Sequence, residues 1–379
     1  MKIAIMTQPL GNNYGGIMQA WALQQVLKRM GHQPVTIDRQ PNQPNMVYKA
    51  ARLIYRAGMK TIGKRKVPIN FEKHLPTILQ HTQGFIDQHL TISEPLCSTQ
   101  QLRDHFEREN YDAVIVGSDQ TWRPKYSPDI YNYFLDFLED KKILRIAYAS
   151  SFGVDDWEFT AEQTKRCAEL AKKFDAISVR EDSGVELCKK HLNVSATLTL
   201  DPTLLLNNED YLSIVDKIKL GSHSKTVCAY FLDKTPETQF FAEALAAQIR
   251  EDVHYLQPKH WASEDTSDSI DSYILPDISE WIHGFNIAKV ILTDSFHGVA
   301  FSHIFQKPFF AVINKSRGST RITSLLSMSG NTNRIIKLPN ENLPQKFSPL
   351  TINNRLYDEK LNSMSFLGKY LSTPQCETA

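Results

Sequence analysis

Three short segments of the sequence gather side chains that can bind an anion or move a proton, and each follows a short apolar run. The first is the stretch 11–16, where glycines let a ligand approach the backbone and asparagines can donate hydrogen bonds. A tight turn between a strand and a helix uses the same residue types, so the stretch alone is compatible with either role. The candidate ligand-binding residues here are Asn12, Asn13, Tyr14, Gly15 and Gly16.

The second segment, residues 117–122, contains Ser118, Asp119 and Gln120. Ser118 or Asp119 can cap a helix that follows, which is the commoner use of such residues. Alternatively, Asp119 accepts a proton from a sugar hydroxyl as a general base. We therefore keep Asp119 as a catalytic candidate, with Ser118 and Gln120 as substrate-binding candidates.

The third segment, residues 293–298, places Asp294, Ser295 and His297 within one turn. A histidine at the start of a helix can bind phosphate or shuttle a proton near neutral pH. We therefore predict that His297 is the leading catalytic residue and that Ser295 contacts the substrate. His303, further along the same helix, is expected to be structural.

Arginines that could hold a phosphate through a bidentate fork are Arg180, directly after the apolar run 176–179, and two in the loop 314–321. This loop contains Lys315, Arg317 and Arg321. A surface ion pair is the alternative for each of them alone. The loop is so dense in cations that we expect at least one to bind the substrate.

Alternating strands and helices are expected to position these segments. Short apolar runs alternate with amphipathic helices from residue 3 to 200 and again from 227 to 313. This alternation predicts doubly wound parallel α/β sheets, in which ligands bind beyond the carboxyl ends of the strands. The expected parts are a Rossmann-like domain 1–207 with a helical insertion at about 46–110, a second Rossmann-like domain 208–349, and a C-terminal helix in 350–379 that could pack back on the first domain.

The insertion contains a run of cations with no acidic residue between Asp38 and Glu72. The cations are Lys49, Arg52, Arg56, Lys60, Lys64, Arg65 and Lys66. With apolar residues between them, they predict a basic amphipathic helix, which can lie on an anionic membrane surface. The alternative is a solvated basic face on a helix packed against the protein, the usual origin of helix amphipathicity.

Composition narrows the class of protein. The formal net charge of +1 gives no reason to expect a nucleic-acid partner. The five cysteines are scattered without a CxxC pair, which favours a reducing compartment and argues against a zinc site. The first residues do not have the pattern of a signal peptide, so we expect none. The sequence also has no membrane-length apolar run and no GxGxxG, P-loop or GxSxG motif. We expect a cytoplasmic protein without a metal or cofactor.

Six motifs, in this order along the chain, resemble those of the polysaccharide pyruvyl transferase family. They are the segments 13–20, 116–122, 148–153, 177–181, 200–205 and 294–298. The resemblance implies a fold like the GT-B glycosyltransferases, with two Rossmann-like domains facing a cleft. It also implies transfer of pyruvate from phosphoenolpyruvate onto two hydroxyls of a sugar, giving a ketal and free phosphate in cell-surface or exopolysaccharide synthesis.

The resemblance extends to individual residues. Arg180 matches the family arginine thought to bind phosphoenolpyruvate, and His297 matches the family histidine with a binding or proton-donor role. Some family members carry an arginine where this chain has Ser295, so we expect Arg317 or Arg321 to supply that charge. We assign His297 as the acid and Asp119 as the base for the acceptor hydroxyls.

The expected partners are phosphoenolpyruvate as donor substrate and a glycan or lipid-linked sugar as acceptor. The basic segment 49–66 offers a peripheral contact with the inner face of the membrane. Two other functions are compatible with the same pattern: a GT-B glycosyltransferase that uses a nucleotide sugar, and a non-catalytic glycan-binding relative, for which Ser295 is the only indication.

Overall fold

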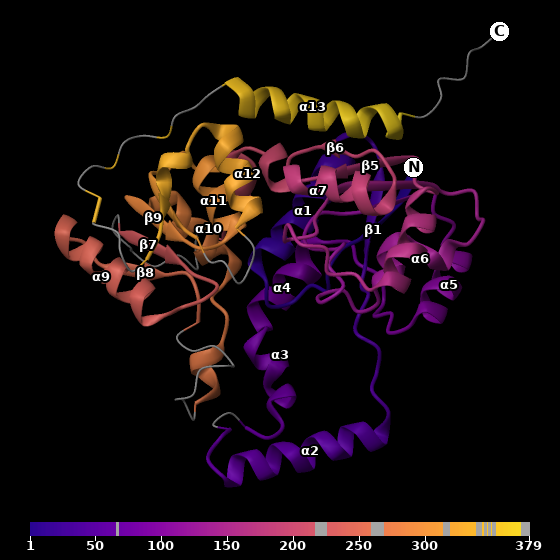
Figure 1. The fold of residues 1–379 in the computed structure, drawn as a ribbon. Coiled ribbons are helices and arrows are strands. Elements are labelled where there is room, and N and C mark those ends of the chain that lie inside the picture. The colour runs from indigo at the N-terminus through magenta and orange to yellow at the C-terminus, as the bar shows by residue number, and fades with distance from the viewer. Residues whose placement is uncertain are drawn as a thin grey trace.

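A computed structural model describes most of the chain. The described residues are 1–65, 68–216, 226–258, 269–313, 319–338, 343, 344, 347, 350 and 354–372. They form two parallel sheets flanked by helices, the α/β class predicted from the sequence (Figure 1).

The first sheet has the strand order β2-β1-β3-β4-β5-β6. Its strands are β1 (Lys2–Met6), β2 (Gln33–Ile37), β3 (Ala113–Val116), β4 (Leu144–Ser150), β5 (Ala176–Val179) and β6 (Thr197–Leu198). The central strand β3 is an uninterrupted apolar run, and β5 is buried along its whole length, because helices cover both faces of the sheet. These strands lie within the part of the chain, up to residue 200, where alternating apolar runs and helices are predicted.

The second sheet has the order β11-β10-β9-β7-β8. Its strands are β7 (Val227–Tyr230), β8 (Val253–Tyr255), β9 (Val290–Thr293), β10 (Phe309–Val312) and β11 (Ile335–Ile336). The edge strand β11 was not predicted, because two apolar residues give no periodic signal.

The helices lie between the strands. They are α1 (Tyr14–Arg29), α6 (Ala161–Ala171), α7 (Asp182–Leu187), α8 (Asn208–Leu212), α9 (Pro236–Ile249), α10 (Ile278–Ile287), α11 (Phe296–Ile304) and α12 (Thr320–Ser329). One expectation is wrong: no helix starts after Asp119, where the chain instead makes turns until a 3-10 helix at Ile130–Phe134.

The segment between β2 and β3 is helical. It contains α2 (Met46–Thr61), a 3-10 turn (Phe71–His74), α3 (Leu75–Ile78), α4 (Gln80–His89) and α5 (Thr99–Arg108). Figure 1 shows α2 lying apart from both sheets, at the end of the molecule opposite α13. The carbonyl of Ile78 accepts a hydrogen bond from the N–H of Leu275, so α3 also contacts the second half of the chain.

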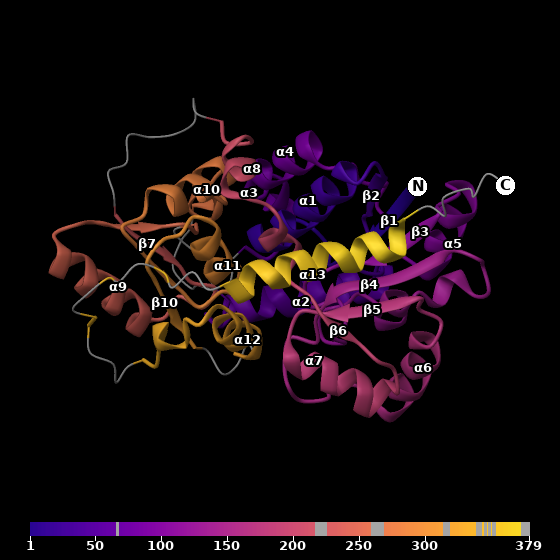
Figure 2. The same cartoon turned by 90° about the horizontal axis from the view of Figure 1, so that it is seen from above.

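The last helix, α13 (Asn354–Leu371), lies across both halves of the molecule (Figures 1 and 2). Ser363 Oγ accepts a hydrogen bond of 2.9 Å from the N–H of Leu200, just after β6. The ring of Phe366 lies 6.1 Å from that of Tyr148 in β4. The C-terminal helix therefore packs on the first sheet.

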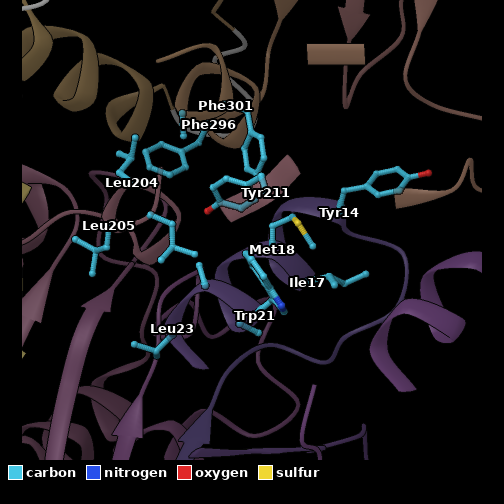
Figure 3. Close-up of a cluster of buried hydrophobic side chains, with 14 of the residues drawn as sticks. Tyr14, Ile17, Met18, Trp21, Leu23, Leu204, Leu205, Tyr211, Phe296 and Phe301 are labelled. Atoms are coloured by element: carbon cyan, nitrogen blue, oxygen red, sulfur yellow. The ribbon is translucent and has the colours of Figure 1, made fainter. Parts of the chain in front are cut away.

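One apolar cluster is shared by the two halves (Figure 3). Trp21 of α1 packs on Tyr211 of α8, and Tyr211 packs on Phe301 of α11, with ring centroids 5.5 and 4.8 Å apart. Burying each such ring contributes roughly 1.5–3 kcal/mol. This packing fixes α1 and α11 relative to each other, and both helices begin at predicted site segments.

Within the described residues, no helix combines the length and the apolar character needed to span a membrane.

Candidate active site

The predicted segments meet because each one follows the carboxyl end of a parallel strand. Asn13 follows β1, Asp119 follows β3, Arg180 follows β5, and His297 follows β9 of the second sheet. Carboxyl ends of parallel strands lie on one edge of a sheet, where α/β proteins bind their ligands. The structure thus brings residues from both halves of the chain to one place.

Arg180 lies at the centre, with its side chain fully buried. Its Nη1 donates to Asp201 Oδ2 at 2.8 Å, and its Nη2 lies 3.4 Å from Asp119 Oδ1. The ring of Phe296, from the second half, stacks on the guanidinium at 4.6 Å. Burial opposes the charge, but Asp201, Asp119 and Glu181 outweigh it and raise the pKa of Arg180, so the arginine stays charged.

Asp201 links the arginine to the histidine. Its Oδ2 accepts hydrogen bonds from Arg180 and from Ser118 Oγ, the latter at 2.7 Å, and lies 3.7 Å from His297 Nε2. Burial by itself would raise the pKa of Asp201, but His297, Arg180 and Thr203 hold it well below its ordinary value. Asp201 is therefore an ionised carboxylate held between Arg180 and His297.

His297 reaches the first half of the chain at Gly15. A Cβ atom placed on Gly15 would lie 2.0 Å from His297 Nδ1, so only glycine leaves room for the imidazole. His297 Nε2 is buried and finds no hydrogen-bond partner among the described residues. A buried polar atom of this kind needs a partner, and a ligand can provide one.

The contact between Gly15 and His297 also brings two helix N-termini together. The first intrahelical bond of α1 runs from Ile17 N to Asn13 O, and that of α11 from Val299 N to Ser295 O. Neither Asn13 nor Ser295 caps its helix with its side chain. The first N–H groups of each helix therefore have no acceptor within the helix and create a positive potential that favours an anion.

Asp119 has a strained backbone, with φ of 75°. Such a conformation is uncommon outside glycine and is found frequently at functional sites. Its Oδ2 accepts a hydrogen bond of 3.3 Å from Asn13 Nδ2, and Gly16 lies close enough that an added Cβ would be 3.4 Å from the same oxygen. No helix begins directly after Asp119, so its side chain is not a helix cap.

Arg321 comes from the first turn of α12 in the second half. Burial lowers its pKa to about 10, with Arg180 and Arg123 lowering it and Asp119 and Glu181 opposing them. The charges of Arg180, Asp119 and Glu181 in the first half of the chain therefore act on Arg321. Thr320 and Ser324 of α12 also bond to Asp155 and Asp182 of the first half, so α12 docks across the two halves.

The remaining predicted residues have other contacts. The Tyr14 hydroxyl donates to the Pro276 carbonyl at 2.7 Å, and its ring stacks on Trp281, so its side chain joins the two halves. Gln120 Oε1 accepts a bond from Arg123 at 3.0 Å. Asn12 is exposed, Ser295 is buried at the start of α11, and Lys315 and Arg317 lie outside the described residues.

Two buried acids of the site were not assigned from the sequence. Asp201 follows β6, the same signal that selected Asp119. Glu181 follows Arg180, and its Oε1 accepts bonds from Ser151 Oγ and the N–H of Phe152. Burial raises the pKa of Glu181 despite the nearby Arg180 and Arg321. Its Oε2 is buried without a hydrogen-bond partner among the described residues.

No cluster of histidine, cysteine and acidic side chains in the described part of the chain could hold a metal ion. The arrangement instead offers two arginines, two helix N-termini, a histidine and ionisable carboxyls. Such a set can bind a phosphorylated anion and transfer protons.

The two parallel sheets flanked by helices form an α/β fold of the GT-B type. The chain belongs to the polysaccharide pyruvyl transferase family, whose sequence profile matches residues 13–316. A search of curated protein sequences found no match.

Solved structures support the fold. The UDP-GlcNAc 2-epimerase of Methanocaldococcus jannaschii, in complex with UDP-GlcNAc and UDP, has a TM-score of 0.51 at 10% identity, covering 97% of this chain and 100% of that one. A putative UDP-N-acetylglucosamine 2-epimerase from Listeria monocytogenes has a TM-score of 0.50 at 11% identity, covering 98% and 90%. At such identities the similarity concerns the fold alone.

Proposed function

We propose that this protein transfers the pyruvyl group of phosphoenolpyruvate onto two hydroxyls of a sugar, forming a cyclic ketal and releasing phosphate. One observation carries the proposal: the N-termini of α1 and α11 meet where Gly15 contacts His297, within reach of the buried Arg180. This arrangement combines an anion site with a proton donor, and a phosphorylated enol needs both.

The anion is held by charges from both halves of the chain. Arg180 and Arg321 would bind the phosphate and carboxylate of the donor, together with the free N–H groups of the two helices. Arg321 would supply the positive charge that some family members obtain from an arginine at the position of Ser295. Burial raises the pKa of Glu181, whose carboxyl group lies next to Arg180.

The reaction begins with a proton transfer from His297 to the methylene carbon of phosphoenolpyruvate, which becomes the methyl group. The adjacent carbon then accepts the first sugar hydroxyl, whose proton passes to a carboxylate. Asp119 is the assigned base, and the ionised Asp201 lies 3.7 Å from Nε2 of the histidine.

In the second half of the reaction the carbon–oxygen bond to phosphate breaks, and the second sugar hydroxyl attacks the same carbon. The sugar loses two hydroxyl protons in all. One of these protons replaces the proton that the enzyme gave to the methyl group, and the other protonates the released phosphate. Positioning of both substrates between the two halves excludes water that would otherwise capture the electrophilic carbon.

The test uses purified protein with phosphoenolpyruvate and p-nitrophenyl glycosides of common hexoses as acceptor probes. Calorimetry should detect phosphoenolpyruvate binding without an acceptor. Phosphate release should require both substrates, and the product should gain the mass of a pyruvate ketal. Protection by UDP-sugars with no binding of phosphoenolpyruvate would contradict the proposal and favour a glycosyltransferase.

A further inference from the structure

Helix α2 turns its apolar face to the solvent. None of its residues is buried, and Val47, Ile54 and Ile62 are 78%, 74% and 62% exposed. Met46 and Tyr55, at 78% and 66%, extend the same surface. In a helix of a globular protein the apolar stripe normally faces the core, so α2 is oriented the opposite way.

Two arginines on the basic side of α2 contact the segment that follows the helix. Arg56 and Arg52 pair with Glu72 Oε1 at 2.7 and 3.3 Å, and both arginines are less exposed than Val47 and Ile54. Arg56 also donates to the Ile69 carbonyl at 3.4 Å. These contacts fix the rotation of the helix and hold its apolar side outward.

We infer that α2 is an interfacial helix that inserts its apolar face into an anionic lipid bilayer. The helix is too short and too charged to span a membrane, and its length and charge pattern match a helix lying in the interface. Tyr48 and Tyr55, exposed at 59% and 66%, have the amphipathic side chains that favour the headgroup region.

The positive charges of α2 favour an anionic bilayer over a second copy of the chain as the binding partner of its apolar face. Glu72 is the first acidic residue after Asp38, and it is already shared by two arginines, while Lys60 and Lys64 remain exposed. A second α2 would bring more cations and no acid within the helix. Anionic headgroups supply the missing counter-charge, and each nearby lysine strengthens binding to them.

The position of α2 also orients the active site. The chain enters α2 from the carboxyl end of β2, which is the sheet edge that carries Asn13, Asp119 and Arg180. Figure 1 shows the helix set off from the sheets at one end of the molecule. On the basis of the proposed function, a bound α2 would hold this edge near the membrane surface, where a lipid-linked sugar acceptor would lie.

The experiment is co-sedimentation of the full chain with vesicles of phosphatidylcholine alone or mixed with phosphatidylglycerol. Wild-type protein should bind the mixed vesicles, and binding should fall when salt rises from about 0.1 M to about 1 M. The double variant Val47→Glu/Ile54→Glu should lose at least about tenfold in partitioning. Phe240→Glu, on a residue 73% exposed in α9, is the matched control and should bind as wild type does.

A second variant, Lys60→Ala/Lys64→Ala, removes two exposed cations and should weaken binding to the mixed vesicles but not to phosphatidylcholine vesicles. Equal vesicle binding by wild type and Val47→Glu/Ile54→Glu would overturn the inference. The inference would also be overturned if the wild-type protein formed a dimer that Val47→Glu/Ile54→Glu dissociates, and if neither protein bound vesicles. Calorimetry with phosphoenolpyruvate, done without vesicles, should be the same for all variants, so a failure of membrane binding is distinguished from a failure of the proposed reaction.

Discussion

Gly15 and His297 touch across the two halves of the molecule, with no space for even a methyl group between them. An added Cβ on Gly15 would lie 2.0 Å from His297 Nδ1 and 2.3 Å from its Cγ. His297 can therefore take this position only because Gly15, in helix α1 of the first half, has no side chain. A general acid that protonates one particular carbon of its substrate must be held in a fixed position, and this contact fixes the imidazole.

Gly15→Ala should accordingly displace His297 and lower kcat/KM by about 10²-fold, the effect typical of a shift of about 1 Å at a reacting group. Steady-state phosphate release measures it. We also expect a loss of about 1–3 kcal/mol in the free energy of unfolding, because the site is overpacked. Gly84→Ala is the control: its Cβ would meet nothing within 4 Å in α4, so activity should be unchanged. Wild-type activity in Gly15→Ala would show that the contact is irrelevant to the reaction.

His297→Gln removes the proposed acid while keeping a polar side chain. We expect kcat to fall about 10²–10⁴-fold, the usual contribution of general acid catalysis. His303→Gln is matched to it, since His303 lies on the same helix with Nδ1 held by the Val299 carbonyl, away from the site. Its activity per folded molecule should stay near wild type. Equal losses in both variants would indicate a structural role for His297.

Arg321→Ala tests whether this arginine supplies the charge missing at Ser295. Loss of a charged hydrogen bond worth about 1.5–3 kcal/mol should raise the KM for phosphoenolpyruvate by roughly 10–100-fold. Arg321→Lys should bind phosphoenolpyruvate more tightly than Arg321→Ala, because it keeps the positive charge. It should bind more weakly than wild type, because lysine lacks the bidentate geometry of the guanidinium group. Arg166→Ala, which removes a surface pair with Asp136, should leave KM unchanged. An unaltered KM in Arg321→Ala would exclude the residue from donor binding.

Much of the fold follows from the sequence, because the strands of both sheets are short apolar runs between amphipathic helices. The positions of Asp119, Arg180 and His297 at strand ends were predictable for the same reason: parallel strands deliver them to one edge. What could not be predicted is which of them touch. The contact of Gly15 with His297 depends on how two sheets pack, and no local pattern encodes it.

Two other features escaped prediction for physical reasons. Asp201 matters because it lies against both Arg180 and His297, a relation that exists only in the folded chain. For α2, periodicity predicts an amphipathic helix but not which side faces outward. That side is decided by the pairing of Arg52 and Arg56 with Glu72.

Asp201 gives the site a measurable pH dependence. Its folded-state pKa is held well below its ordinary value, so the unfolded chain binds the proton more readily. The stability contributed by Asp201 is therefore fully present above about pH 4, the unfolded value, and is lost as pH falls further.

Asp201→Asn should lose about 3 kcal/mol at pH 7, because it removes one of the acids that balance the buried Arg180. The variant should also lose less additional stability than wild type between pH 5 and more acidic conditions, since the titrating carboxylate is gone. Urea unfolding at several pH values measures both effects. Parallel stability curves for the two proteins through this range would mean that Asp201 has an ordinary pKa in the folded state, and that His297 and Arg180 do not hold it ionised.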